Sequence, residues 1–321
     1  MAMPAFPTRT SSPSAPTKAS RMTLASVVSG VKRAPARVLI YGVPKVGKST
    51  WAAGAPAPIW LGLDAGTEHL DVARFPEPES FEDVLEAIRT LEGEHPYKTL
   101  VVDPVNWIEP LIWKHLCSKN NWADIEAPGY GKGYTAAVDV WRTFVAALDR
   151  LRERGMHVVL VGHSTIKTLK NPEGDDYDRY QLPIHDKAAG LLTSWSDCIL
   201  FAQHEIDAKK ERGSSKVKAI GTGYRLLRTQ PAAAYEAGNR FSLQDPLPLE
   251  PDLFWSVANG PRPEVVDLRK ESLELAAMLG GDAVEKAQGA IAKMGEDVGR
   301  LTNLRNAIQK AIQKANEEEA S

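Results

Sequence analysis

The chain has 321 residues, which is enough for one large domain with appendages or for two modest domains. Hydrophobic residues make up 43% and charged residues 25%, as in ordinary globular proteins, and the formal net charge of -2 excludes a protein-wide positive field for nucleic acid. Two isolated cysteines, Cys117 and Cys198, exclude a disulfide framework and cysteine-based zinc sites, and no apolar run has the ~18 residues of a membrane span, so we expect a cytoplasmic protein that does not contact a membrane.

Residues 1–36 are rich in Ser, Thr, Pro and Ala, and the first acidic residue of the chain is Asp64. This composition favours a disordered basic arm. A basic, acid-free start is also typical of an organelle transit peptide, and a flexible arm that touches nucleic-acid phosphates is a third interpretation. We expect a core over residues 37–258 and a helical C-terminal region over residues 259–321.

From Arg37 onward, short apolar runs alternate with amphipathic stretches, which predicts the α/β class with a mostly parallel sheet flanked by helices. The strands are expected at Val38–Tyr41, Ile59–Leu63, Thr99–Val102, His157–Val161 and Cys198–Ala202. The helices are expected at Lys48–Ala53, Ser80–Leu91, Asn106–Lys119, Thr135–Arg154 and Lys187–Trp195.

Beyond the fifth strand, Val217–Ile220 and Tyr224–Arg228 resemble the two strands of a hairpin joined at glycines. A proline-rich loop follows, and the remainder reads as two helices split at Gly280–Gly281. The second has an apolar stripe from Ile291 to Ile312, which suits core docking, self-association or partner binding.

The segment GVPKVGKST matches the phosphate-binding Walker A pattern in full, directly after a strand and at the start of a helix. Its glycines let the backbone N–H groups point at a phosphate chain. We expect Lys48 to contact the outer phosphates of ATP and Ser49 to bind Mg²⁺. The predicted nucleotide-binding residues are Gly42, Val43, Pro44, Lys45, Val46, Gly47, Lys48, Ser49 and Thr50.

The strand TLVVD ends in Asp103, the expected Walker B acid, and ligands of such sheets lie at the carboxyl ends of the strands. We therefore predict Mg²⁺ ligation by Asp103 together with Ser49. No guanine-recognition motif occurs, which argues against a GTPase.

Hydrolysis also needs a carboxylate that orients or deprotonates the attacking water. Pro104 follows the Walker B acid, so this carboxylate has to come from elsewhere, and Glu68 is the first candidate with Asp64 second. Each could equally be an ordinary acid of a surface loop.

His163 follows the fourth strand, where it could be structural or could sense the terminal phosphate. Metal binding by His163 together with His185 is a further hypothesis, but the spacing of the two residues matches no metal-ligand motif. The stretch Ser164–Lys187 reads as a long functional loop in which cations alternate with aromatic rings, a combination that suits single-stranded DNA, although its four acids oppose simple phosphate binding. The candidate DNA-binding residues are Lys167, Lys170, Tyr177, Arg179 and Tyr180.

Several segments together resemble the phage-type RecA-like P-loop ATPases, including the Sak group of single-strand-annealing recombination proteins. They are DPVNWIEPLIW, GYGKGY, VVLVGHS, NPEGDDYDRYQL and AGNRFSL, within a resemblance that covers Arg37 to Leu249.

This resemblance implies ATP and Mg²⁺ use, binding of single-stranded DNA, strand annealing in phage recombination inside the bacterial host cytoplasm, and a homo-oligomer. It matches His163 to a strand-tip sensor and Arg240 to a cation that reaches a neighbour's nucleotide. A single-strand-binding or other replication or recombination protein is a possible partner. The sequence departs from the family in having Gly238 where a lysine is usual and Asp64-Ala65-Gly66 where a Glu-Gly-Gly run is usual.

Two hypotheses follow. The first is an ATP-dependent recombination protein whose catalytic residues are Glu68, Lys48, His163 and Arg240. The second is an ATP-switched adaptor with little hydrolysis that recruits a partner through its terminal helix.

Overall fold

The computed structural model describes residues 23–27, 34–210, 217–259, 263–294 and 298–319. Most of the N-terminal arm expected over residues 1–36 lies outside these ranges. The chain divides into two compact units, one of residues 33–266 and one that includes residues 267–321.

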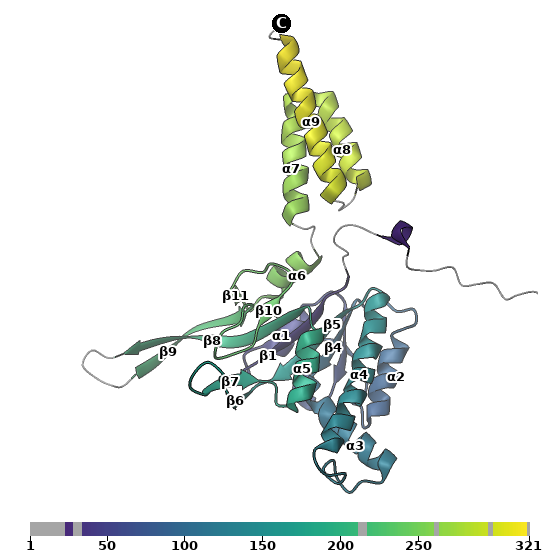
Figure 1. Ribbon diagram of the computed structural model, residues 1–321, viewed down its shortest axis with the longest axis vertical. Coiled ribbons are helices and arrows are strands. Elements are labelled where there is room, and N and C mark those ends of the chain that lie inside the picture. The colour runs from purple at the N-terminus through teal and green to yellow at the C-terminus, as the bar shows by residue number, and fades with distance from the viewer. Residues whose placement is uncertain (1–22, 28–33, 211–216, 260–262, 295–297, 320–321) are drawn as a thin grey trace, which may run out of the picture. The chain divides into compact units, whose positions relative to one another are not determined.

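The larger unit is built on a nine-stranded sheet in the order β11-β9-β8-β1-β5-β4-β2-β3, with β10 paired to β8 (Figure 1). The strands from β3 to β8 in this order are parallel, and β9, β10 and β11 are antiparallel additions at one edge. The strands span Arg37–Gly42 (β1), Pro58–Gly62 (β2), Ala73–Arg74 (β3), Thr99–Asp103 (β4), His157–His163 (β5), Cys198–Lys210 (β8), Val217–Arg228 (β9), Gly238–Asn239 (β10) and Leu247–Pro248 (β11). The predicted α/β class with a mostly parallel sheet and flanking helices is confirmed.

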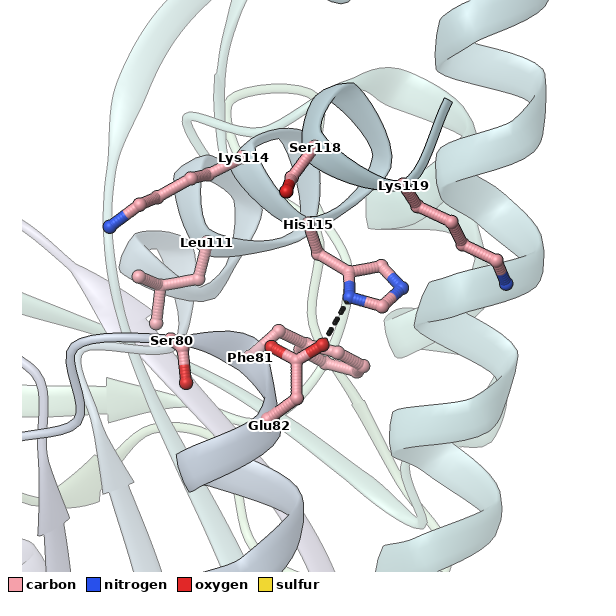
Figure 2. A pocket seen from close by; sticks show the side chains of 8 residues that line it. All are labelled: Ser80, Phe81, Glu82, Leu111, Lys114, His115, Ser118 and Lys119. Carbon is pink, nitrogen blue, oxygen red and sulfur yellow. Dashed lines mark hydrogen bonds and ion pairs between the residues drawn. The ribbon is translucent and has the colours of Figure 1, made fainter. Parts of the chain in front are cut away.

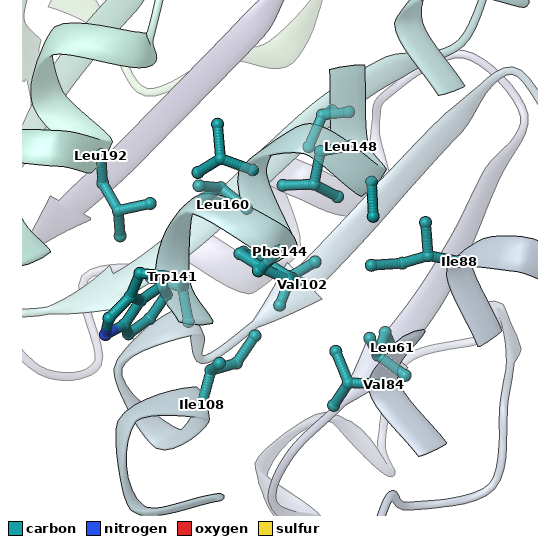
Figure 3. Packing of buried hydrophobic residues seen from close by; sticks show 14 of the residues in the cluster. Leu61, Val84, Ile88, Val102, Ile108, Trp141, Phe144, Leu148, Leu160 and Leu192 are labelled. Atoms are coloured by element: carbon teal, nitrogen blue, oxygen red, sulfur yellow. The ribbon is translucent and has the colours of Figure 1, made fainter. Parts of the chain in front are cut away.

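Helices cover both faces of this sheet because its central strands are apolar on both sides. On one face, the side chains of alternate residues such as Leu39, Leu61, Val102 and Leu160 pack against α2, α3, α4 and α5 (Figure 3). These helices span Phe81–Thr90 (α2), Ile108–Asn120 (α3), Lys132–Glu153 (α4) and Asp186–Trp195 (α5).

On the other face, the intervening residues, including Ile40, Trp60 and Val159, pack against two helices, Lys48–Ala53 (α1) and Pro251–Asn259 (α6). The rings of Trp51, from α1, and Phe254, from α6, meet at 5.4 Å between centroids. The α6 helix was not expected, because its segment read as part of a proline-rich loop. Pro251 instead stands at the first position of a helix, where its fixed φ and missing N–H are tolerated.

Two further expectations about strands were wrong. The segments Val217–Ile220 and Tyr224–Arg228 are one continuous strand, β9, which pairs with a β8 much longer than predicted. Figure 1 shows β8 and β9 running on together as a two-stranded ribbon beyond the neighbouring strands. The stretch Ser164–Lys187 is mostly a hairpin rather than a loop, formed by Thr165–Leu169 (β6) and Tyr177–Gln181 (β7).

The described residues of the tail form three helices, Pro263–Met278 (α7), Gly281–Met294 (α8) and Val298–Glu319 (α9). The break at Gly280–Gly281 is as predicted, but the apolar stripe from Ile291 to Ile312 belongs to two separate helices. Within the described residues, no helix is long and apolar enough to span a membrane.

Candidate nucleotide site

The Walker A loop follows β1, which lies between β5 and β8. Gly42 has a φ of +149°, and a Cβ there would lie 2.0 Å from the Ala202 carbonyl oxygen of β8, so only glycine fits. Val43 N–H donates to the same oxygen at 3.2 Å. Gly47, at φ +103°, turns the loop into α1. The two Walker glycines are therefore required by backbone geometry, as the motif predicts.

Lys48 is 7% exposed and lies inside the loop. Its ammonium donates hydrogen bonds to the carbonyl oxygens of Gly42 at 3.1 Å and Val43 at 3.0 Å. Burial lowers the pKa of Lys48, and the charge of Asp103 partly opposes that shift. The amine is thus a desolvated cation held by neutral carbonyl groups, an arrangement that a polyphosphate anion would stabilise further.

Asp103 ends β4 and is 5% exposed. Burial raises its pKa from 3.8 to about 6, the charge of Asp64 adds to the rise, and hydrogen bonds from Ser49 and Trp60 and the charge of Lys48 only partly offset it. Its Oδ2 atom is buried and has no hydrogen-bond partner of good geometry among the described residues. This buried carboxylate oxygen lies beside the Ser49 hydroxyl, and both oxygens suit an oxygen-coordinated cation such as Mg²⁺.

The two candidate carboxylates of the β2–β3 connection lie in different surroundings. Asp64 is half-buried, caps the short 3₁₀ helix Ala65–Thr67 by accepting from Gly66 N–H at 2.9 Å, and raises the pKa of both Asp103 and His163. Glu68 is exposed at the other end of that turn. The structure therefore brings Asp64, the second candidate of the sequence, into the cluster with Asp103, and it leaves Glu68 at the surface.

His163 ends β5, the strand between β1 and β4, so the sheet places it between the two Walker motifs. Burial lowers its pKa, the charge of Lys48 lowers it further, and Asp64 opposes both. Its backbone N–H donates to Asn106 Oδ1 at 3.1 Å. Asn106 follows the Walker B acid by three residues, so a hydrogen bond ties the end of β5 to the Walker B loop.

The five candidate DNA-binding residues share the β6–β7 hairpin but not the same exposure. Lys170 is exposed, and Tyr177 is half-buried. Lys167 bonds to Asp186 Oδ1 at 2.8 Å and to the Ile184 carbonyl oxygen at 3.1 Å. The hairpin therefore offers Lys170 most freely to a ligand.

The remaining two hairpin candidates face the body of the larger unit. Arg179 donates to the Tyr235 carbonyl oxygen at 3.1 Å. Tyr180 packs on Phe201 of β8 with 5.0 Å between ring centroids. A cavity of about 480 Å³ lies under the hairpin, and its lining includes Lys167, Lys170 and Arg179.

His185 lies in different surroundings from His163. The His185 ring stacks on Tyr134 at 4.9 Å, and its Nδ1 accepts from Lys187 N–H at the start of α5. The backbone N–H of His185 donates to the buried carboxylate of Glu109 at 2.9 Å. Among the residues that the structure describes, no group of three or more His, Cys, Asp or Glu side chains could hold a metal ion, and the paired-histidine metal hypothesis finds no support.

Arg240 lies beside the amino ends of β1 and β8, whereas the Walker A loop follows the carboxyl end of β1. Its guanidinium is 63% exposed and bonds to the buried Asp197 at 2.9 Å. Arg37 and Arg152 bond to the same carboxylate at 2.7 and 3.1 Å. Within its own chain, Arg240 is therefore separate from the cluster of Lys48 and Asp103.

Sequence reasoning missed one cation beside the Walker A loop. Arg225 of β9 donates to the Val46 carbonyl oxygen at 3.4 Å. Its place depends on the pairing of β9 with β8, which no short motif reveals.

A separate surface pocket of about 400 Å³ lies between α2 and α3 (Figure 2). In it, His115 Nδ1 lies 2.5 Å from Glu82 Oε1. None of its lining residues belongs to the cluster around the Walker motifs.

Comparison with known proteins agrees with this site. The sequence model of a family described as AAA domain matches residues 34–241, which include both Walker motifs, His163 and Arg240. None of the curated proteins matches the chain. Among solved structures, the chain is similar to a KaiC-like protein of the hyperthermophilic archaeon Pyrococcus horikoshii, at 13% identity and a TM-score of 0.34, over 66% of this chain and 84% of that one.

Proposed function

This chain belongs to the AAA domain family, and from that membership we propose that it hydrolyses ATP and couples the nucleotide state to binding of single-stranded DNA. A RecA-like P-loop ATPase core is supported by the family match and by the sheet, in which β5 separates the two Walker strands. The observation that carries the proposal is the cluster of Lys48, Asp103, Asp64 and His163 at the carboxyl ends of adjacent parallel strands.

In this proposal each member of the cluster has a separate role. The Walker A backbone and Lys48 bind the phosphate chain. Ser49 and Asp103 would hold Mg²⁺, which supplies charge neutralisation on the phosphates when it is bound. The raised pKa of Asp103 favours this role, because a cation beside the carboxylate would remove its desolvation penalty.

Asp64 is the proposed carboxylate for the attacking water. It is half-buried and electrostatically coupled to Asp103 and His163, whereas Glu68 is exposed. His163, kept neutral by a lowered pKa, can orient the water or a phosphate oxygen through its ring without adding a charge.

The proposed route from nucleotide to DNA starts at His163, because β6 begins only two residues later. In the hairpin, Lys167 bonds to Asp186 at the start of α5. The preceding residue, His185, donates its backbone N–H to Glu109 of α3, the helix that follows the Walker B strand. A shift at the strand tip can therefore reach the hairpin through direct bonds.

The central experiment measures ATP turnover with and without single-stranded DNA. We expect DNA to stimulate turnover by the wild-type chain. Lys170→Ala should weaken binding of a labelled oligonucleotide and lower the slope of log affinity against log salt by about 0.7, the value for one lost phosphate contact on a single strand. ATP affinity should not change. Arg142→Ala, at an exposed position of α4, is the matched control. Unchanged oligonucleotide affinity in Lys170→Ala would rule out the hairpin as the DNA surface.

We further propose that the chain acts in strand annealing as a homo-oligomer in which Arg240 reaches the nucleotide of a neighbour. The exposure of Arg240 supports this role, because its guanidinium is accessible to a second chain. Arg240→Ala should abolish DNA-stimulated turnover while ATP binding persists. Equal turnover by this variant and the wild type would contradict the role.

The alternative is an ATP-switched adaptor with little hydrolysis. The three-helix tail, part of a separate compact unit, favours it as a docking element. ATP binding without measurable turnover, with or without DNA, would favour the adaptor.

A further inference from the structure

The strand β9 places a cation directly against the phosphate-binding loop. Arg225 pairs in register with His204 of β8, and its backbone carbonyl accepts from Leu249 N–H at 3.0 Å, so the backbone that carries the side chain is held on both sides. Its guanidinium then reaches the Val46 carbonyl oxygen at 3.4 Å.

This contact depends on a Walker glycine. A Cβ on Gly47 would lie 2.7 Å from Arg225 Nη1 and 3.5 Å from Leu249 Cδ2. The guanidinium therefore occupies the space that any side chain at this position would need. Gly47 serves the left-handed turn of the loop and, in addition, the close approach of this cation.

Arg225 has no carboxylate partner among the side chains that the structure describes. Among the side chains that the structure describes, no Asp or Glu oxygen lies within 4.0 Å of it, whereas Arg228 on the same strand approaches Asp245 and Arg240 approaches Asp197. The nearby acid Glu205 accepts instead from the Thr222 hydroxyl at 2.7 Å. Arg225 is exposed, and within the described part of the chain its guanidinium bonds to the neutral carbonyl group of Val46 and to no anion, so it can still bind an anion.

We propose that Arg225 is a second cation for the phosphate chain of the bound nucleotide, supplied by β9 and acting beside Lys48. The inference rests on the proposed use of ATP at this loop. Because β9 continues into the ribbon with β8, Arg225 also gives that ribbon a direct contact with the nucleotide site. Arg225 is a phosphate-binding residue in this proposal, whereas Asp64, the proposed carboxylate for the attacking water, lies on the other side of β1.

The test compares three substitutions in the full-length chain, using binding of ATP and of inorganic tripolyphosphate. Arg225→Lys keeps the charge, Arg225→Gln keeps a hydrogen-bond donor without charge, and Arg225→Ala removes both. We expect Arg225→Ala and Arg225→Gln to weaken both ligands by about 10-fold or more, and Arg225→Lys by less than about 3-fold, because charge rather than tethering of Val46 matters. The affinity of Arg225→Ala should also depend less on salt than that of the wild type. Arg142→Ala is the control for a lost surface arginine.

Two outcomes would overturn the proposal. Unchanged affinity in Arg225→Ala would show that the cation does not serve the phosphates. Near-normal affinity in Arg225→Gln with weak binding in Arg225→Lys would show that the residue only tethers the loop. Comparing Lys with Gln at one position keeps the test valid if the alanine variant misfolds. Failure of the wild-type chain to bind ATP would instead refute the proposed function, so the two failures are distinguishable.

Discussion

Replacing Asp103 by asparagine should stabilise the nucleotide-free protein while removing the proposed magnesium ligand. The carboxylate is 5% exposed, and its pKa rises from 3.8 to about 6 on folding. Since one pKa unit corresponds to ~1.36 kcal/mol, keeping this group ionised in the folded chain costs about 3 kcal/mol. We therefore expect Asp103→Asn to raise the free energy of unfolding by about 2–3 kcal/mol at pH 7.5.

The pH dependence has a definite sign. Because the pKa is raised on folding, the stability that protonated Asp103 provides is fully present below pH 3.8 and is lost as the pH rises through about 6. The advantage of Asp103→Asn should thus shrink from pH 7.5 towards pH 4.

The assay is urea unfolding, followed by tryptophan fluorescence, without nucleotide and with a chelator present. Every tryptophan lies between residues 51 and 255, so the signal reports the larger unit and not the helical tail. The control is Asp139→Asn, at an exposed position of α4, where we expect the free energy of unfolding to change by no more than about 0.5 kcal/mol. Equal stability of Asp103→Asn and wild type at pH 7.5, or an advantage that grows as the pH falls, would refute the reasoning.

Four further substitutions separate binding, chemistry and stability. Lys48→Ala should abolish the stabilisation that ATP gives in thermal unfolding. For the wild type this stabilisation amounts to ~2.7 kcal/mol at an ATP concentration of 100 times Kd. An equal stabilisation of Lys48→Ala by ATP would contradict the role of Lys48. Asp64→Asn should lower single-turnover hydrolysis by about 10²–10⁴-fold with nearly normal ATP binding, whereas Glu68→Gln should change it little; the reverse pattern would restore Glu68 as the carboxylate. Asp197→Ala should lower the free energy of unfolding by about 3–5 kcal/mol in urea, because the half-buried Arg37 loses its main anion. A loss below about 1 kcal/mol would show that the ion pairs of Asp197 do not stabilise the fold.

The sequence predicts the parts of the site that depend on local geometry. Gly42, Gly47 and Lys48 act within one loop, and Asp103 ends a short apolar strand, so spacing alone places them. The sequence ranks Glu68 above Asp64, but spacing does not reveal which of the two is buried, because that depends on how the turn after β2 packs beside the end of β4.

The errors arise where long-range pairing overrides local signals. Gly221 and Gly223 have the composition of a turn, yet both lie inside β9, opposite the irregular pairing between His204 and Ile206 of β8. The position of Arg225 follows from that register and has no sequence signature. The β6–β7 hairpin was not predicted because its side chains are largely polar and its inward residues are only half-buried, so no apolar alternation marks the two strands.

Asp197 has three arginine partners, and this excess bears on assembly. Burial works to raise the pKa of Asp197, but the bonds and charges of Arg37 and Arg152 outweigh it, so its net pKa is lowered. Arg240 is the most exposed of the three cations. If a neighbouring nucleotide drew Arg240 away, the buried carboxylate would keep Arg37 and Arg152 as partners, so no buried charge would be left unpaired. In the proposed oligomer, Asp197 could therefore release Arg240 to a neighbour's nucleotide and remain paired with Arg37 and Arg152.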